Sequence, residues 1–171
     1  MTRGGVAIPL WLRALSFLII APGTITILLP RYLNGGSLAP GTASLALRAI
    51  ALLLIAMGYA ILLWCFRDFV RRGQGTPAPY DPPRKLVVAG LYRFTRNPMY
   101  VALAIVLLGE ALWCWSSPLL IYAGIVALAF HLRVLIYEEP KLTELFGEDF
   151  AAYRARVPRW IPRLRAGPRA A

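Results

Sequence analysis

The chain has 171 residues, of which 58% are hydrophobic, and a formal net charge of +11 at pH 7. Its mean hydropathy of +0.60 excludes an ordinary soluble domain, because the apolar residues form long blocks that suit a bilayer better than a small core. The basic residues crowd the edges of these blocks, which favours contact with anionic lipid headgroups and argues against a nucleic-acid partner.

The first two apolar blocks cover residues 8–29 and 49–66. The first block carries Arg13 near its start and a Pro22-Gly23 pair that predicts a kink. It resembles a secretory signal, but Arg13 interrupts the apolar run, and the nearest small-residue cleavage pattern lies far beyond it. We therefore expect a retained helix. The second block contains no charged residue.

The third and fourth blocks, residues 98–115 and 118–137, are separated only by Ser116 and Ser117. Helices of 18 to 20 residues are about 27–30 Å long, which matches one hydrocarbon core. The short separation predicts a tight antiparallel hairpin, and Trp113 and Trp115 near its tip suit an aromatic belt at the membrane surface. The four blocks together predict an all-α, multi-pass membrane protein with about four transmembrane helices.

The distribution of basic residues predicts the orientation. Only Arg31 and Arg48 lie on one side of the blocks, whereas the loop 67–97 and the region after Glu139 each carry seven Lys or Arg residues. By the positive-inside rule, we expect both termini and the 67–97 loop to be cytoplasmic. Cys65 and Cys114 then lie towards opposite faces of the membrane, so we expect no disulfide between them.

This topology places the sequence RNPMY at residues 96–100 next to Glu138 and Glu139, which end the fourth block. After these acids, Leu142, Leu145, Phe146, Phe150 and Tyr153 recur near one helical face. The recurrence predicts an amphipathic helix that lies on the membrane surface. A basic, proline-broken tail follows it.

Three stretches in order carry a resemblance to a known group: LVVAGLYRFTRNPMY at 86–100, EE at 138–139 and LFGEDFAAYRARVPRWIP at 145–162. From about residue 73 to 163 the chain resembles membrane methyltransferases of the isoprenylcysteine carboxyl methyltransferase and phospholipid N-methyltransferase group. The resemblance implies S-adenosylmethionine (SAM) as cofactor, in a cytoplasm-facing pocket that the C-terminal segment caps. By the family pattern, the cofactor-binding residues are Leu86, Val87, Tyr92, Asn97, Pro98, Met99, Tyr100 and Glu138.

The chemistry of SAM is compatible with these residues. A carboxylate pairs with its cationic groups or accepts hydrogen bonds from its ribose diol. Its own carboxylate suits an arginine or lysine, for which the sequence offers Arg84, Lys85, Arg93 and Arg96. The two tyrosines suit stacking on adenine or contact with the sulfonium. Methyl transfer disperses charge, so alignment and partial desolvation would do most of the work.

Further residues are candidates for chemistry or for the acceptor. We expect catalytic roles for His131, Arg133 and Glu139, with His131 as a possible base, and acceptor contacts for Arg156 and Arg159. Each has a simpler alternative. The two acids suit the first turn of a helix, His131 suits packing, and the arginines suit lipid headgroups.

Two other polar features have structural alternatives. Arg96-Asn97-Pro98 is also a plain helix start beside a lipid phosphate, and the two tyrosines are also interfacial anchors. Glu110 lies inside the third block near its outer end, where we expect it to reach water or to pair with Arg31 or Arg48.

Two departures from the family pattern leave the acceptor open. The isoprenylcysteine branch typically has His where this chain has Asn97, and its substrate-contacting Arg falls on Val134, one residue from Arg133. An isoprenylcysteine-like carboxylate, an amine lipid, another isoprenoid-like acceptor and a small thiol all remain candidates. No metal is expected.

We expect a single domain over residues 1–171, with two N-terminal transmembrane helices in 1–70 and the methyltransferase core in 71–171, in a bacterial inner membrane. The alternative function is that of a catalytically inactive relative that serves as a membrane anchor or interaction module.

Overall fold

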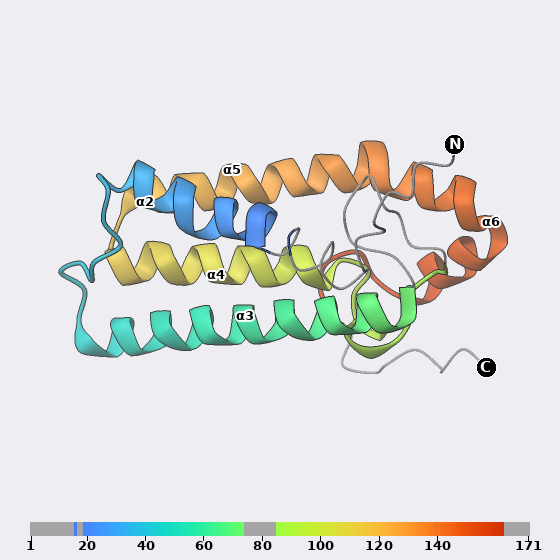
Figure 1. Ribbon diagram of the computed structural model, residues 1–171, viewed down its shortest axis with the longest axis horizontal. Coiled ribbons are helices and arrows are strands. Elements are labelled where there is room, and N and C mark those ends of the chain that lie inside the picture. Colours follow the sequence, from blue (N-terminus) through green and yellow to red (C-terminus); the bar gives the residue numbers. More distant parts are fainter. Residues whose placement is uncertain (1–15, 17–18, 74–84, 163–171) are drawn as a thin grey trace, which may run out of the picture.

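The computed structural model describes residues 16, 19–73 and 85–162 (Figure 1). Arg13, Arg84, most of the first apolar block before Ile19 and the tail after Pro162 lie outside the described residues. The described residues contain helices and no strand, which confirms the all-α prediction. The elements are η1 (Thr24–Leu28), α2 (Leu29–Leu33), α3 (Leu45–Gly73), η2 (Gly90–Arg93), α4 (Pro98–Cys114), α5 (Ser117–Arg133), η3 (Val134–Glu138) and α6 (Glu139–Arg156).

Helices α3 and α4 pack closely because glycines remove side chains from their interface. A Cβ atom on Gly58 of α3 would lie 2.9 Å from the Ala102 carbonyl oxygen, and one on Gly109 of α4 would lie 3.0 Å from the Ala51 carbonyl oxygen. The two contacts also show that the helices are antiparallel. Small residues at an interface allow backbones to approach, as is common between helices in membranes.

The N-terminal helical segment, residues 19–33, lies alongside α4 and α5 (Figure 1). Its segment η1 is a π-helical turn that follows Pro22 and Gly23, where the sequence predicts a kink. The Tyr122 hydroxyl donates to the Ile25 carbonyl at 2.9 Å, and the Thr26 and Tyr59 hydroxyls are 2.9 Å apart. Side chains from α3 and α5 thus hold this turn in place.

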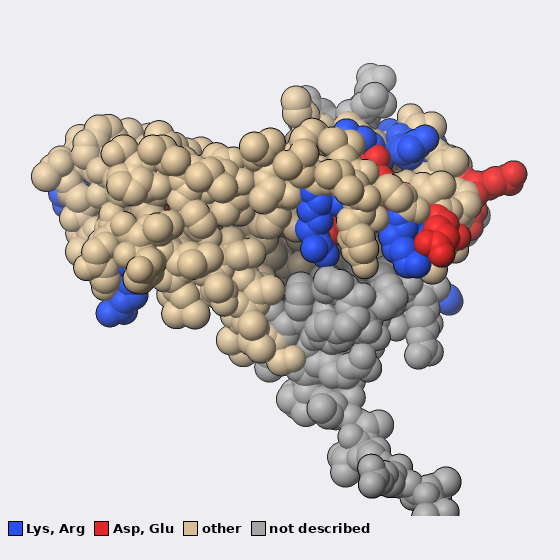
Figure 2. All heavy atoms as spheres, turned by 90° about the horizontal axis from the view of Figure 1, so that it is seen from above, with Lys and Arg blue, Asp and Glu red and all other residues tan. Residues whose placement is uncertain are grey.

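Two helices, Leu45–Asp68 and Ser117–Arg156, are long and apolar enough to cross a membrane, and Ile19–Leu33 and Pro98–Cys114 are shorter apolar helices. Leu53 on α3 and Ile121 and Ile125 on α5 are more than 60% exposed. Figure 2 shows the charged side chains gathered at the end of the molecule formed by α6, beside a long surface with few charges. Together with the apolar helices, this surface identifies a membrane protein.

The hairpin between the third and fourth apolar blocks is confirmed, with its turn one residue earlier than predicted. Helix α4 ends at Cys114, Trp115 adopts a left-handed conformation with φ of 51°, and α5 begins at Ser117. The segment before α3 folds onto this tip, where Trp113 Nε1 donates to the Leu38 carbonyl at 3.0 Å. Cys65 and Cys114 are both buried and free, as predicted.

The predicted helix after Glu139 is present as α6, and its place on a membrane surface stays a prediction. Helix α5 continues through the π-helical turn η3 into α6, with Pro140 in the first turn of α6. Proline lacks an N–H group and leaves a carbonyl one turn earlier unbonded, which a wide turn accommodates. The chain bends instead at Gly147, whose φ of 47° and ψ of −118° suit glycine. Beyond the bend, Phe150 and Tyr153 face inward and are buried.

The prediction for Glu110 is wrong. Its side chain is buried, Oε2 has no hydrogen-bond partner within the described residues, and no salt bridge joins it to Arg31 or Arg48. Its neighbour Gly109 marks a close approach of α4 to α3, which encloses this position. Arg48 donates instead to the Gly41 carbonyl at 2.6 Å.

Candidate functional site

The charged end of the bundle brings together the segment 85–97, the start of α4, the end of α5 and the residues that follow α6. The sequence prediction that residues 96–100 lie beside Glu138 and Glu139 is confirmed by direct hydrogen bonds from Arg96 and Tyr100 to these acids. The two acids belong to different networks, which differ in burial.

The first network surrounds Glu138 and is open to solvent. Arg133 Nε donates to Glu138 Oε1 at 2.9 Å and to the Tyr100 hydroxyl at 3.1 Å, and the Tyr100 hydroxyl donates to the same carboxylate oxygen. The Glu138 and Arg133 side chains are 26% and 41% exposed. The Tyr100 ring stacks on Phe130 with centroids 4.4 Å apart. Within the described residues, the hydrogen bonds to Glu138 all use Oε1, which leaves Oε2 for another donor.

The second network surrounds Glu139 and is largely buried. Arg96 Nη1 and Arg159 Nε donate to Glu139 Oε1 at 2.8 and 2.7 Å, and Arg159 Nη2 donates to Oε2 at 2.9 Å. The hydrogen bond to Glu139 raises the pKa of Arg159, whereas burial lowers the pKa of Arg96 against the opposing effect of the Glu139 charge. One buried carboxylate thus holds two guanidinium groups.

The C-terminal strap, residues 157–162, is fastened to the loop before α4. The Arg159 carbonyl accepts hydrogen bonds from the Thr95 hydroxyl at 2.9 Å and from the Asn97 amide at 3.1 Å. The Arg96 backbone N–H donates to the Pro158 carbonyl at 2.9 Å. Together with the Arg159–Glu139 pair, these bonds fix the strap across the start of α4.

The segment 85–93 packs into the apolar interior beneath the networks. Val87 and Tyr92 are buried with Cys65, and Met99 packs against this cluster. Leu86 packs against the buried cluster of Phe150, Tyr153 and Val157. The Tyr153 hydroxyl donates to the Tyr92 carbonyl at 2.7 Å, and burial raises the pKa of the Tyr92 phenol well above its ordinary value.

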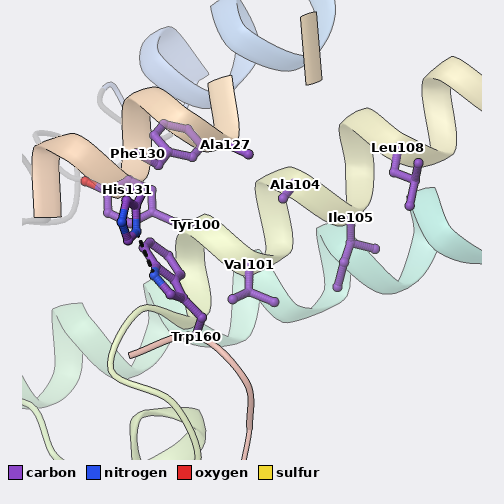
Figure 3. Close-up of a pocket in the computed structure, with 9 residues that line it drawn as sticks. All are labelled: Tyr100, Val101, Ala104, Ile105, Leu108, Ala127, Phe130, His131 and Trp160. Atoms are coloured by element: carbon purple, nitrogen blue, oxygen red, sulfur yellow. Dashed lines mark hydrogen bonds between the residues drawn. The ribbon is translucent and has the colours of Figure 1, made fainter. Parts of the chain in front are cut away.

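An apolar groove of about 420 Å³ adjoins the Glu138 network. Tyr100 belongs to both, and Trp160 of the strap closes one side of the groove (Figure 3). The groove runs along α4 towards Leu108. Its lining residues are Tyr100, Val101, Ala104, Ile105, Leu108, Ala127, Phe130, His131 and Trp160.

His131 is the polar side chain of α5 in this groove. Trp160 Nε1 donates to His131 Nδ1 at 3.1 Å, and their ring centroids are 5.9 Å apart (Figure 3). The imidazole thereby fastens the strap to α5 as well as to the loop before α4.

The structure therefore divides the candidate residues into three groups. Tyr100, Arg133 and Glu138 meet at the open network, and His131 faces the groove beside it. Asn97, Glu139 and Arg159 hold the strap, and Pro98 is the first residue of α4. Leu86, Val87, Tyr92 and Met99 pack beneath. Arg156 meets none of them: it is exposed and donates to the Ala152 carbonyl at 3.0 Å.

Three residues of the site escaped the sequence prediction. Phe130 lies within an apolar block, where an aromatic residue carries no distinguishing signal. Thr95 acts through its hydroxyl on a backbone carbonyl, and Trp160 lies in a proline-broken tail. The sequence WIP after a basic stretch would not by itself predict a contact 29 residues away with His131.

The open network has the chemistry that SAM requires. Glu138 Oε2 can accept a hydrogen bond or face a cation, the guanidinium of Arg133 suits a carboxylate, and the stacked rings of Tyr100 and Phe130 suit a planar base or a sulfonium. For a metal the donors are missing: the described residues contain no group of three or more His, Cys, Asp or Glu side chains that could hold one.

Comparisons with known proteins give the following matches. The family model described as phospholipid methyltransferase matches residues 46–149, more than half of the chain. The protein-S-isoprenylcysteine O-methyltransferase of Schizosaccharomyces pombe is 31% identical over 77 residues, which cover 45% of this chain and 33% of that protein. The protein-S-isoprenylcysteine O-methyltransferase B of Arabidopsis thaliana is 31% identical over 78 residues, which cover 46% and 40%. The matched parts thus span two fifths or less of either relative.

Proposed function

We propose, since the chain belongs to the phospholipid methyltransferase family, that it transfers a methyl group from SAM to a lipophilic or membrane-partitioned acceptor at the cytoplasmic face of the membrane. The observation that carries this proposal is the position of Tyr100. Its hydroxyl belongs to the open Glu138 network, and its ring lines the apolar groove. A polar cofactor site and an apolar acceptor site therefore adjoin at one side chain.

The Glu138 network is the part of the chain that would hold SAM. Glu138 Oε2 would accept a hydrogen bond from the ribose or face a cationic group, and Arg133 would hold Glu138 in place or contact the methionine carboxylate. The aromatic pair Tyr100 and Phe130 would provide the stacking surface. When bound, SAM supplies an electrophilic methyl group.

The protein's own contribution is alignment and exclusion of water. The strap fixes Trp160 at the side of the groove, and the bonds to Arg159 and Pro158 fix the strap. A methyl acceptor whose chain lies along α4 would present its reactive end beside Tyr100. Since direct displacement requires the attacking atom in line with the methyl group, such positioning is the main source of rate acceleration that we expect.

The shape and apolar lining of the groove suit an acceptor with an apolar chain, but they do not distinguish among the candidate acceptors. An isoprenylcysteine-like carboxylate is suggested by the names of both relatives. The residue types at Asn97 and Val134 differ from those of that branch, so an amine lipid, another isoprenoid-like compound or a small thiol are equal candidates.

The membrane arrangement that accompanies this function has four crossings, formed by the N-terminal apolar block and by α3, α4 and α5. It forms one domain over residues 1–171, in which residues 71–171 contain the methyltransferase core. Both termini lie in the cytoplasm, and the membrane is a bacterial inner membrane. The proposed orientation rests on the excess of basic residues in the 67–97 loop and after Glu139.

The test combines binding and turnover. Calorimetry on the purified protein in detergent measures SAM affinity. Mass spectrometry then follows gain of one methyl group on N-acetyl-S-farnesylcysteine, phosphatidylethanolamine and a long-chain thiol. The active-enzyme proposal requires that the protein binds SAM and that it methylates at least one of these three probe compounds. The inactive-relative alternative predicts no SAM binding, a result that would refute the proposal.

A further inference from the structure

The contact between His131 and Trp160 determines where the imidazole carries its proton. An indole N–H is a donor and has no lone pair to accept with. Because Trp160 Nε1 lies 3.1 Å from His131 Nδ1, Nδ1 must present its lone pair to the indole. A neutral imidazole has one protonated nitrogen, so the proton is on Nε2.

The Nε2–H group is available to a molecule in the groove. His131 lines the groove and is half-buried. Within the described part of the chain, its hydrogen bond with Trp160 is the one that the imidazole makes. The groove-lining residues of α4 from Val101 to Leu108 are aliphatic, and the hydroxyl of Tyr100 already donates to Glu138. Among the described residues that line the groove, the imidazole Nε2–H is therefore the side-chain donor that the protein does not already engage.

This arrangement is incompatible with His131 as a general base. A base needs a free lone pair, and the lone pair of Nδ1 is held by Trp160 while Nε2 carries a hydrogen. We propose instead that His131 is a specificity-determining residue that donates from Nε2 to an uncharged oxygen of the methyl acceptor, such as a carbonyl or ether oxygen, and that Trp160 is a positioning residue that fixes the tautomer. The proposal rests on the proposed function in taking the groove as the acceptor site.

The Nε2–H donor of His131 disfavours an acceptor that places an ammonium group beside it in the groove. An ammonium group brings only donors and a positive charge, so it gains nothing from Nε2–H and loses hydration in the apolar groove. An oxygen atom at the same place can accept a hydrogen bond from Nε2–H. The inference thus favours a lipophilic acceptor with an oxygen on its apolar part over one with an amine at that position.

The tautomer can be measured directly because the sequence contains one histidine. Protein with ring-¹⁵N histidine and no histidine tag is studied by long-range ¹H–¹⁵N NMR at about pH 8. We expect the Nε2–H tautomer in the wild type and a mixture of tautomers in Trp160→Phe, which keeps an aromatic ring but lacks the donor. The Nδ1–H tautomer in the wild type would overturn the proposal.

The same spectrum tests the contact with an oxygen, without any methyl transfer. A long-chain methyl ketone and the alkane of the same length are added to the protein in matched micelles. We expect the ketone to shift the Nε2–H resonance and the alkane to leave it nearly unchanged. No response to the ketone, or an equal response to both probes, contradicts the proposal.

Kinetics then link the contact to the reaction. His131→Gln keeps an N–H donor near the position of Nε2, whereas His131→Phe keeps a ring without a donor. With an oxygen-bearing acceptor from the panel, His131→Phe should raise its KM by about 2- to 12-fold, with SAM affinity unchanged, and His131→Gln should stay near the wild type. Equal KM values for all three proteins would refute the role of His131 even if methyl transfer is demonstrated. If no acceptor is methylated but the ketone shifts Nε2–H, the proposed function fails and the donor contact stands.

Discussion

Glu138 and Glu139 are consecutive in the chain, yet their carboxylates belong to separate networks. Glu138 Oε1 meets Arg133 at 2.9 Å in a solvent-exposed cluster, and Glu139 Oε1 meets Arg96 and Arg159 at 2.8 and 2.7 Å in a buried one. Adjacent helical residues point about 100° apart, and the π-helical turn that ends at Glu138 changes the direction locally. Removing the charge of Glu138 and removing that of Glu139 should therefore affect different properties of the protein.

Glu138→Gln should weaken SAM binding and leave stability nearly unchanged. The substitution keeps the shape of the side chain and removes the charge that faces the proposed cofactor. Loss of a charge-assisted hydrogen bond costs about 1.5–3 kcal/mol, or about 10- to 150-fold in affinity. Calorimetric titration with SAM measures the change. Wild-type affinity in this variant would mean that Glu138 does not contact the cofactor.

Glu139→Gln should lower stability more than Glu138→Gln does. Glu139 is 9% exposed, and its loss of charge leaves the nearly buried Arg96 without a counter-ion. Removal of one partner of a buried ion pair costs about 3–5 kcal/mol, and the remaining amide oxygen recovers part of this, so we expect about 2–3 kcal/mol. The melting temperature should fall by about 5–10 °C.

The comparison of the two Gln variants in one detergent serves as the control for the Glu139 prediction. Equal melting temperatures would show that the Arg96–Glu139–Arg159 cluster contributes little to the free energy of unfolding. A selective loss of SAM affinity in Glu139→Gln at unchanged stability would instead support the direct catalytic or cofactor role that the sequence suggests.

The apolar blocks and the proximity of residues 96–100 to the two acids were predictable, because hydrophobic length and charge asymmetry determine them. The bend at Gly147 was not predictable. The apolar spacing of three and four residues continues across it, and a glycine inside a helical pattern does not by itself indicate a positive φ. The strap was missed for another reason. It is held by hydrogen bonds to the backbone carbonyls of Pro158 and Arg159. Every residue has a backbone carbonyl, so the residue types in the sequence do not predict these bonds.

Gly109→Leu should disrupt the packing of α3 against α4. A Cβ atom added at this position would lie 2.8 Å from Ile55 Cγ1 and 3.0 Å from the Ala51 carbonyl oxygen, so a larger side chain would force the helices apart. We expect a loss of about 1–3 kcal/mol or aggregation on extraction. The control is Gly124→Leu, because a Cβ atom there meets nothing within 4 Å. Thermal denaturation monitored by size-exclusion chromatography compares the two, and equal stability would argue against close α3–α4 contact.

The proposed orientation predicts which sites react from outside an intact bacterial cell. Ser37, Lys85 and Ser117 are all exposed, and the native Cys65 and Cys114 are buried. With a membrane-impermeant maleimide, Ser37→Cys and Ser117→Cys should be labelled, and Lys85→Cys should be labelled only after lysis. Labelling of Lys85→Cys in intact cells would invert the topology and place the Glu138 network on the outer face.

Ala104→Phe should block the acceptor without weakening SAM binding. Ala104 lines the middle of the groove, along α4 between Tyr100 and Leu108, so a phenyl group fills the space in which the acceptor chain is proposed to lie (Figure 3). We expect the KM of a lipophilic acceptor to rise more than about tenfold, since a fully buried apolar side chain contributes about 1.5–3 kcal/mol. SAM affinity should stay within about twofold, because the Glu138 network lies beyond the end of the groove.

The matched control for this groove variant is Ala60→Phe, which makes the same change at an exposed position of α3 away from the groove. It should keep the wild-type KM for both substrates, since its ring would face lipid. If Ala104→Phe and Ala60→Phe both turn over the acceptor like the wild type, the acceptor does not use this groove. If both lose SAM binding, the loss reflects misfolding and not a blocked site. The two variants thus separate the position of the acceptor from the integrity of the helical bundle.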